Sequence, residues 1–337
     1  MKEVNILFTS SGRRVELIKS FKQSLHNLNL KGKIIIADCN HYISTAVIAD
    51  CYETVPRVND SNYISRLKEI CQKHKIKLLI PLIDNELLKL SLHRQSFAKL
   101  GVKILVSAPE TNEICFDKQK TATFFQQVGV RTPAVLDSET ILANPQYQYP
   151  VLIKPANGSS SVGVTIINNA KELAFFKDYI PNAIVQELLT GQEYTLDVLI
   201  DFTGQVRCIV PRLRIATRAG EISKGITVKN RDIIAAGKRI AEALPGAIGC
   251  LNIQCFQLPN NEIIFIEINP RFGGGIPLSI KAGANYPQWI LKMLLKQDLS
   301  VAIDDWQEGV MMLRHDESFF IQSKLIDINR EKLAEIS

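Results

Sequence analysis

Residues 252–287 read NIQCFQLPNNEIIFIEINPRFGGGIPLSIKAGANYP, the most informative segment of this 337-residue chain. Two apolar runs, residues 250–258 and 263–268, are separated by a polar Pro-Asn-Asn turn at 259–261. Such a pattern predicts a β-hairpin with one buried face.

The second run ends in polar side chains at every other position. Glu267, Asn269 and Arg271 are spaced two apart, so in a strand they share one face, and Gln254 on the partner strand can point to the same place. Carboxylate and amide oxygens suit Mg²⁺, and a planar guanidinium can hold a phosphate. The glycines at 273–275 let backbone approach a ligand closely. The plain alternative is a core hairpin with a polar end.

Composition limits the class of protein. With 46% hydrophobic and 22% charged residues, the chain reads as globular and long enough for two or three domains. Its net charge of +6 without a block of like charge predicts small polyanionic ligands rather than nucleic acid. No apolar run approaches the roughly 20 residues that span a bilayer, and the first run is too short for a signal peptide, so no membrane partner is expected.

Cysteine and histidine usage indicates the compartment and excludes some metals. Seven cysteines occur without a C-x-x-C pair, most of them in apolar runs, which fits core residues in a reducing cytoplasm. Five scattered histidines show no zinc-ligand spacing. We therefore expect a cytoplasmic protein without zinc.

The first third of the chain alternates strands with helices. Apolar strands at 4–9, 33–38, 78–82 and 103–106 are separated by helical patterns at 15–28, 62–75 and 85–100. This alternation predicts a parallel sheet in a domain that ends near residue 110.

Two loops of this domain are candidate ligand contacts. After the first strand, residues 10–14 read SSGRR and lack the glycines of a dinucleotide fingerprint, so NAD binding is disfavoured. Arg13 and Arg14 at a helix start can contact an anionic substrate or be solvated surface residues. After the third strand, Asp84 and Glu86 can face a substrate amine, although an N-cap role is favoured for Asp84.

A buried lysine precedes a glycine- and serine-rich loop in the middle of the chain. Lys154 lies in the apolar strand 149–155, where a lysine is costly unless paired or liganded. Residues 157–164 read NGSSSVGV, a loop whose N–H and hydroxyl groups can cradle phosphate. The sequence does not match a Walker A loop, and a plain hairpin loop is the less favoured alternative.

Charged residues follow in the next segment. A strand at 184–189 and a hairpin at 195–200 and 206–211 are expected, with Glu187 and Glu193 able to accept hydrogen bonds from an adenine amine and ribose hydroxyls. Beyond the hairpin, a glycine-containing loop is expected to carry cations that offset the charge of a triphosphate: Arg212, Arg214, Arg218 and Lys224.

The order of these motifs resembles the ATP-grasp superfamily. It is most similar to the synthetase-subunit branch of carbamoyl phosphate synthetase, whose N-[VI]-Q and E-[MI]-N-P-R strings match residues 252–254 and 267–271. The likeness spans residues 4–295. It implies an α/β ATP-grasp fold with an N-terminal parallel-sheet domain (1–110), a small lid (111–185) and a C-terminal mixed-sheet domain with a peripheral tail (186–337).

The resemblance also implies roles for individual residues. Lys118 and Lys154 would hold ATP phosphates, under a loop of Ser159, Ser160, Ser161, Val162 and Gly163. Gln186, Glu187, Leu188 and Leu189 would meet adenine, and Glu193 the ribose. Gln254, Glu267 and Asn269 would hold Mg²⁺, with Mn²⁺ as the alternative metal. Arg271 would stabilise the transferring phosphoryl group, assisted by Lys224 and Arg218.

The chain departs from carbamoyl phosphate synthetase in three ways. It has a single ATP-grasp unit, no glutamine-hydrolysing part, and Arg and Lys in the loop 216–224 where that enzyme has His. The likeness therefore implies a carboxylate–amine ligase that acts on small molecules, forms an acyl phosphate and releases ADP and phosphate; a homo-oligomer is compatible with this. Carboxyphosphate formation from bicarbonate and a non-catalytic ATP-binding regulator are the alternatives.

Overall fold

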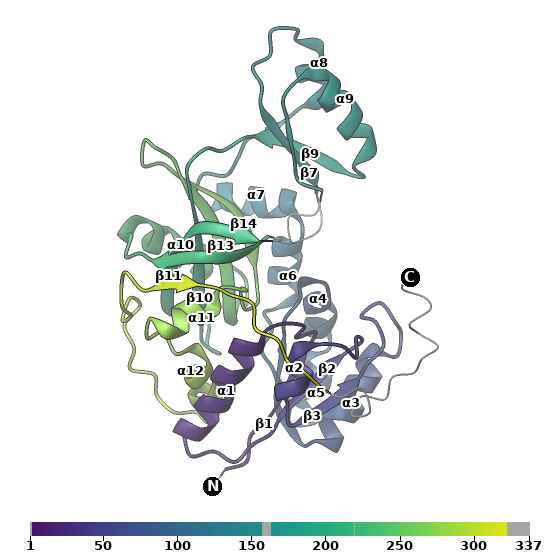
Figure 1. Ribbon diagram of the computed structural model, residues 1–337, viewed down its shortest axis with the longest axis vertical. Helices are drawn as coiled ribbons and strands as arrows, with labels where there is room; N and C mark the ends of the chain where they lie inside the picture. The colour runs from purple at the N-terminus through teal and green to yellow at the C-terminus, as the bar shows by residue number, and fades with distance from the viewer. Residues whose placement is uncertain (1, 157–162, 219, 322–337) are drawn as a thin grey trace.

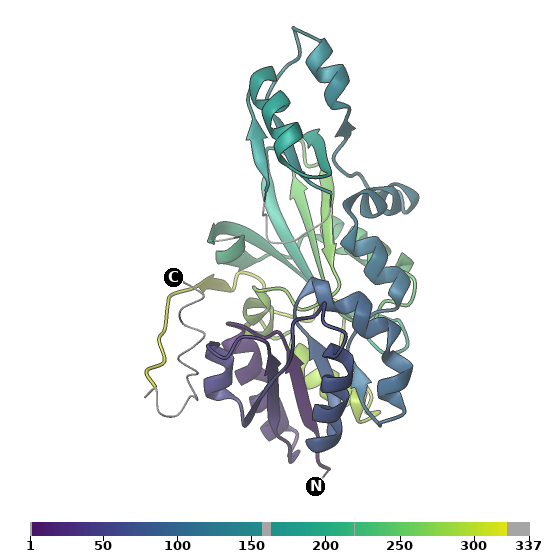
Figure 2. The same cartoon turned by 90° about the vertical axis from the view of Figure 1, so that its right-hand side faces the viewer.

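A computed structural model describes residues 2–156, 163–218 and 220–321 (Figure 1). These residues form three sheets, one in each of three parts of the molecule. Figures 1 and 2 show the N-terminal part at one end of the long axis, the lid at the other end and the largest sheet between them.

The N-terminal domain contains the expected parallel sheet, in the order β3-β2-β1-β4-β5. Its elements are β1 (Asn5–Thr9), α1 (Val15–Asn27), β2 (Ile34–Asp38), α2 (Ser44–Ile48), β3 (Cys51–Thr54), α3 (Tyr63–Lys73), β4 (Ile76–Pro81), α4 (Asp84–Leu92), α5 (Arg94–Ala98) and β5 (Lys103–Ile104). Every residue of β1 and β2 is buried, because helices cover both faces of a parallel sheet.

Two details of this domain differ from the prediction. The edge strand β3 was not expected, because its short CYET sequence lacks an apolar run and is held by backbone pairing with β2. The helix expected at 85–100 is divided into α4 and α5 at His93, whose backbone leaves the helical region at φ −103° and ψ 4°.

Two helices connect this domain to the rest. They are α6 (Pro109–Phe116) and α7 (Lys118–Gln127), and both pack against β14 of the largest sheet, while α6 also contacts α4. Asp117 caps α7 by accepting hydrogen bonds from the backbone N–H groups of Gln119 and Lys120 at 2.8 and 3.1 Å. These helices, within the range expected for the lid, therefore lie outside the lid sheet.

The lid is a small antiparallel sheet in the order β6-β9-β7-β8. Its elements are β6 (Val135–Leu136), α8 (Ser138–Ala143), β7 (Val151–Pro155), β8 (Thr165–Ile167), α9 (Ala170–Tyr179) and β9 (Ala183–Glu187). The lid has a hydrophobic cluster of its own, which includes Ile153, Ile167 and Leu173. The lid therefore has a core of its own, and it lies at the opposite end of the long axis from the N-terminal domain (Figure 1).

The largest sheet has the order β14-β13-β10-β11-β12-β15, and its named strands pair antiparallel, while one isolated parallel bridge joins Arg131 to Ile264 of β14. Its elements are β10 (Gln192–Ile200), β11 (Val206–Arg218), β12 (Glu221–Thr227), α10 (Arg231–Ala243), β13 (Gly249–Gln257), β14 (Ile263–Asn269), α11 (Ile276–Lys281), α12 (Tyr286–Leu294) and β15 (Met311–Leu313). The predicted hairpin is confirmed as β13 and β14, and its register pairs Gln254 with Glu267 and Asn252 with Asn269.

Part of the described segment 301–321, which was expected to be peripheral, joins the largest sheet. Its strand β15 extends the sheet beside β12, and the indole N–H of Trp306 donates to the Ile209 carbonyl at 2.9 Å. Five of the seven cysteines are buried, as expected of core residues. No helix in the described ranges is long and apolar enough to cross a membrane.

Candidate functional site

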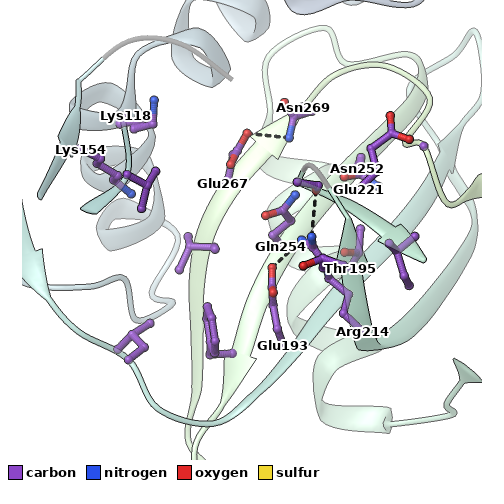
Figure 3. A pocket seen from close by; sticks show the side chains of 18 of the residues that line it. Lys118, Lys154, Glu193, Thr195, Arg214, Glu221, Asn252, Gln254, Glu267 and Asn269 are labelled. Carbon is purple, nitrogen blue, oxygen red and sulfur yellow. Dashed lines mark hydrogen bonds and ion pairs between the residues drawn. The ribbon is translucent and has the colours of Figure 1, made fainter. Parts of the chain in front are cut away.

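A cavity of about 460 Å³ lies where the lid, the largest sheet and the N-terminal domain meet. Strands β7 and β9 of the lid form one wall, and β10, β11, β13 and β14 form the other. Figure 3 shows Lys118 and Lys154 across from Glu267, with Gln254 and Asn269 beside it.

The end of the hairpin brings the four predicted side chains together. Asn269 Nδ2 donates to Glu267 Oε1 at 2.9 Å, and Arg271 Nη2 donates to Asn269 Oδ1 at 3.1 Å. Gln254 stands opposite Glu267 in the register and also lines the cavity. Alternation along the strand places these groups on one face, as the sequence pattern predicted.

Arg271 is anchored by the N-terminal domain. Its Nη2 donates to Asp84 Oδ2 at 2.7 Å, and both side chains are largely buried. Asp84 is the first residue of α4, whose N-cap is Ile83, so the favoured N-cap role for Asp84 is wrong. Arg271 Nε and Asp84 Oδ1 are buried without a hydrogen-bond partner among the described residues.

Glu86 has a structural role instead of facing a substrate. It is fully buried, and its Oε1 accepts from the backbone N–H groups of Leu82 and Ile83 at 3.0 and 3.3 Å. The Tyr63 hydroxyl donates to its Oε2 at 2.6 Å. Burial raises the pKa of Glu86, although these hydrogen bonds oppose that shift. Glu86 closes the first turn of α4.

Two lysines of the cavity lie close enough to repel each other. Lys154, on β7, is 8% exposed, and burial followed by repulsion from Lys118 lowers its pKa to about 8, against the attraction of Glu267. Burial also lowers the pKa of Lys118, the first residue of α7, and Glu267 opposes this shift. Lys118 Nζ donates to the Ala156 carbonyl at 3.4 Å. A polyanion placed between these lysines would offset their repulsion.

Part of the expected phosphate loop lies outside the described residues. This applies to Ser159, Ser160, Ser161 and Val162. Gly163 is described and has φ +75°, a left-handed conformation that favours glycine.

The segment between β9 and β10 forms the wall expected to meet a base and a sugar. Gln186, Glu187, Leu188, Leu189 and Glu193 all line the cavity. Burial raises the pKa of Glu193, and the charge of Arg214 opposes this shift. Arg214 Nη1 donates to Glu193 Oε1 at 2.5 Å, so the pair is already formed.

Arg212 and Asp197 form a buried ion pair that the sequence did not reveal. Arg212 Nε and Nη2 donate to the two Asp197 oxygens at 2.7 and 3.0 Å. Asn252 and Ser279 also donate to Asp197, at 3.0 and 2.6 Å. Arg212 Nη1 has no hydrogen-bond partner in the described part of the chain, and Arg212 lines the cavity near Gly275.

Arg218 and Lys224, expected to assist catalysis, do not line the cavity. The expected loop is instead the strand pair β11 and β12, so Arg212 and Arg214 occupy alternate inward positions. Arg218, near the hairpin tip, has a 59% exposed side chain and pairs with Asp316. Lys224 is exposed next to β15. The alternation of basic and apolar residues at 212–214 could have predicted that this segment continues the strand instead of forming a loop.

The two arginines before α1 have different surroundings. Arg14 lines the cavity, and its Nη1 lies 3.1 Å from Glu221 Oε1. Arg13 has a 66% exposed side chain. The substrate-contact alternative therefore suits Arg14, and the surface alternative suits Arg13.

The fold and the cavity together define the ATP-grasp class of proteins. This class has a parallel N-terminal sheet, an antiparallel lid and a large antiparallel sheet, with the cavity between them. Three family models match: "PylC-like, N-terminal domain" over residues 6–105, "D-ala D-ala ligase C-terminus" over 130–218 and "ATP-grasp in the biosynthetic pathway with Ter operon" over 179–317. The match order follows the three parts of the fold.

Curated relatives agree with this class. The D-alanine–D-alanine ligase of Pseudomonas putida strain GB-1 is 33% identical over 224 residues, which cover 58% of this chain and 68% of that protein. The carbamoyl phosphate synthase large chain of Campylobacter jejuni is 28% identical over 212 residues, 54% of this chain but only 18% of that much longer protein. The chain belongs to the ATP-grasp superfamily, and these relatives are ATP-dependent ligases.

Solved structures show the same fold at low sequence identity. N5-carboxyaminoimidazole synthetase from Staphylococcus aureus, complexed with ADP, superposes with a TM-score of 0.70 at 17% identity, covering 99% of this chain and 87% of that one. The biotin carboxylase domain of 2-oxoglutarate carboxylase from Hydrogenobacter thermophilus, in complex with MgADP, ADP and bicarbonate, has a TM-score of 0.72 at 14% identity, covering 91% and 73%.

Proposed function

We propose that this protein is an ATP-dependent ligase that joins a small-molecule carboxylate to an amine through an acyl phosphate. The observation that supports it most is the convergence of Glu267, Asn269 and Arg271 opposite Lys118 and Lys154 in one cavity. Oxygen donors and cations on facing walls match the needs of a triphosphate and its metal.

The donor set at the hairpin end fits Mg²⁺, with Mn²⁺ as an alternative. Glu267 supplies a carboxylate, and Asn269 and Gln254 supply amide oxygens, which are hard ligands. When bound there, the metal would offset the charge of the phosphate oxygens. Lys118 and Lys154 would hold the phosphates from the other side of the cavity.

The reaction proceeds in two steps. A carboxylate oxygen of the acid forms a bond to the γ-phosphorus of ATP, and the bond between that phosphorus and the β–γ bridging oxygen breaks, so ADP leaves. The amine nitrogen then bonds to the acyl carbon, phosphate leaves with the electron pair of the C–O bond, and the nitrogen loses a proton. Arg271, held by Asp84, stabilises the charge of the transferring phosphoryl group.

Protection from water is the contribution of the lid. An acyl phosphate hydrolyses readily, so the cavity must exclude water while the intermediate exists. Strands β7 and β9 supply Lys154, Gln186 and Glu187 to the same cavity as the hairpin end, which supports a role for the lid in covering the nucleotide.

Carboxyphosphate formation from bicarbonate is the second candidate. Several of the similar structures are biotin carboxylases or N5-carboxyaminoimidazole synthetases, and one contains bicarbonate. A non-catalytic regulator is less well supported, because the hairpin end retains its carboxylate, amides and arginine together.

Trapping the intermediate tests the proposed function. With Mg-ATP, hydroxylamine and a panel of small carboxylates and amino acids, we expect ADP release and a hydroxamate that both depend on the acid. Hydroxamate and ADP can be quantified by mass spectrometry. Turnover driven by bicarbonate alone would favour carboxyphosphate formation, and binding of Mg-ATP without turnover on any acid would favour the regulator.

The affinity for ATP should fall as pH rises through the pKa of Lys154. That pKa is lowered to about 8, so the side chain is charged at pH 7 and mostly neutral at pH 9.5. Only the charged lysine attracts a phosphate, and bound phosphate raises its pKa, so binding is tighter on the acidic side. Calorimetry at the two pH values should show an affinity about tenfold weaker at pH 9.5, the equivalent of about 1.4 kcal/mol.

Lys154→Arg is the matched control, because arginine stays charged over this range. The variant should lose most of the pH dependence even where its affinity at pH 7 is reduced. Lys154→Ala should bind ATP weakly at both pH values. An alanine variant that binds ATP as tightly as the wild type would show that Lys154 is a structural residue.

A further inference from the structure

A second cavity of about 300 Å³ adjoins the first. The two cavities share Arg14, Glu221, Ile222 and Gly274, so they meet at the Arg14–Glu221 ion pair. The second cavity lies between the start of α1, the strand β12 and residues 314–319. A molecule bound beside the nucleotide can therefore extend into this space.

Three guanidinium groups surround one carboxylate at this junction. Arg14 Nη1, Arg314 Nη1 and Arg13 Nη2 lie 3.1, 3.1 and 3.8 Å from Glu221 oxygens. Arg14 and Arg314 are the inner two, with side chains 18% and 29% exposed. A single carboxylate cannot balance the charge of both inner arginines.

Neighbouring acids do not supply the missing charge. Asp84 pairs with Arg271, and Asp197 pairs with Arg212. The remaining acids of the second cavity are at its exposed rim: Glu16 pairs with Lys19, Asp316 pairs with Arg218, and Glu317 is exposed. Burial lowers the pKa of Arg14, and although Glu221 opposes this, the charges of Arg271, Arg314 and Arg13 lower it further.

Two further observations indicate a ligand at this wall. Arg212 lines the first cavity with a side chain that is only 1% exposed, and its buried Nη1 has no hydrogen-bond partner among the residues described. The backbone leaves room for the guanidiniums of Arg14 and Arg212 only because Gly274 and Gly275 lack side chains. A Cβ there would lie 2.4 Å from Arg14 Nη1 and 2.1 Å from Arg212 Nη1. An unsatisfied buried donor such as Arg212 Nη1 favours an anionic acceptor.

We propose that the acid substrate carries a second anionic group, a carboxylate or a phosphate, which binds Arg14 and Arg314 where the two cavities meet. The reacting carboxylate then lies at Arg271, and Arg212 Nη1 donates to the part between the two ends. This inference rests on the proposed function, because it assigns a substrate class to the same site. The second anion supplies the charge that Glu221 alone leaves unbalanced.

The competing explanation is that these arginines neutralise the triphosphate of ATP. The two explanations differ in the Michaelis constant that each arginine controls. Loss of a substrate contact raises the KM for the acid, whereas loss of a nucleotide contact raises the KM for ATP. Steady-state kinetics of the same variants therefore separates them.

The test compares acids that differ in a single anionic group: glutamate with glutamine, aspartate with asparagine, and glutarate with pentanoate. Each is supplied with Mg-ATP and hydroxylamine, and hydroxamate formation gives kcat/KM, while calorimetry on the Mg-ADP-loaded protein gives affinity. We expect the anionic member of at least one pair to exceed its neutral partner about tenfold or more. Equal values for both members of every pair, in turnover and in binding, would overturn the proposal.

Variants then assign the preference to residues. Arg14→Gln and Arg314→Gln should each raise the KM for the preferred anionic acid about tenfold and leave the KM for ATP unchanged. Arg13→Gln is the matched control, since it removes the same charge from the exposed neighbouring residue, and it should change neither constant by more than about twofold. Thermal melting checks that each variant is folded. If only one of the two variants Arg14→Gln and Arg314→Gln folds, its KM values alone are enough to assign the acid preference.

Two results would contradict the inference in distinguishable ways. A rise in the KM for ATP, with the acid preference intact, would mean that Arg14 and Arg314 serve the nucleotide. Failure of the wild type to bind Mg-ATP would refute the proposed function itself, before any acid is compared.

Discussion

Replacing Glu267 by glutamine should reduce turnover about a thousandfold and leave the fold intact. Glu267 is the carboxylate among the groups at the hairpin end, and its Oε1 accepts from Asn269 Nδ2, a bond that a glutamine carbonyl can also accept. The substitution keeps size and shape but removes the charge that attracts Mg²⁺. A loss of about 4 kcal/mol of electrostatic stabilisation in the transition state corresponds to this factor.

The measurement compares turnover with thermal melting. Without nucleotide, Glu267→Gln should melt close to the wild-type temperature, whereas the stabilisation produced by Mg-ATP should shrink. Glu262→Gln, on the same hairpin but paired with Arg131 at its outer end, is the matched control and should retain turnover. Near-wild-type turnover by Glu267→Gln would show that the hairpin end does not bind the metal.

Replacing Asp197 by alanine should lower the free energy of unfolding by about 3–5 kcal/mol. Asp197 is 1% exposed and accepts hydrogen bonds from Arg212, Asn252 and Ser279. Its removal leaves a buried guanidinium without its counter-charge and two polar side chains without an acceptor. Urea denaturation followed by far-ultraviolet circular dichroism measures the change.

Two further variants make this result specific. The double variant Asp197→Leu/Arg212→Met removes both charges and should recover a large part of the lost stability, because an apolar pair needs no counter-charge. Asp316→Ala breaks the exposed pair with Arg218 and should leave the denaturation midpoint unchanged. A stable Asp197→Ala protein would mean that water satisfies Arg212 in its place.

Local pattern was sufficient for the hairpin and its polar end. Glu267 and Asn269 lie in one strand, whose geometry places their side chains on the same face, and Arg271 follows two residues after the strand ends. The alternating strands and helices likewise predicted a parallel domain, and its sheet is confirmed. These features depend on residues that are close in sequence.

Features that depend on distant residues could not be predicted in this way. Asp84 and Arg271 are 187 positions apart, and the ion pair forms because two domains meet. In the sequence, Asp197 could not be distinguished from any other polar residue in a strand. Its partner Arg212 lies on the neighbouring strand β11, two residues beyond Val210, which is the residue directly opposite Asp197 in the register. Arg218 was expected to lie in a loop that reaches the first cavity. It lies instead at the end of the long strand β11, where its exposed side chain pairs with Asp316 outside that cavity.

The ion pair between Asp84 and Arg271 has a consequence for how such proteins can be recombined. Separate family models match the N-terminal domain and the later segments of the chain. Yet the arginine assigned to phosphoryl transfer takes its counter-charge from the first residue of α4, in the N-terminal domain. A graft that exchanges residues 6–105 must bring an acid to that position, because otherwise a buried guanidinium loses its partner.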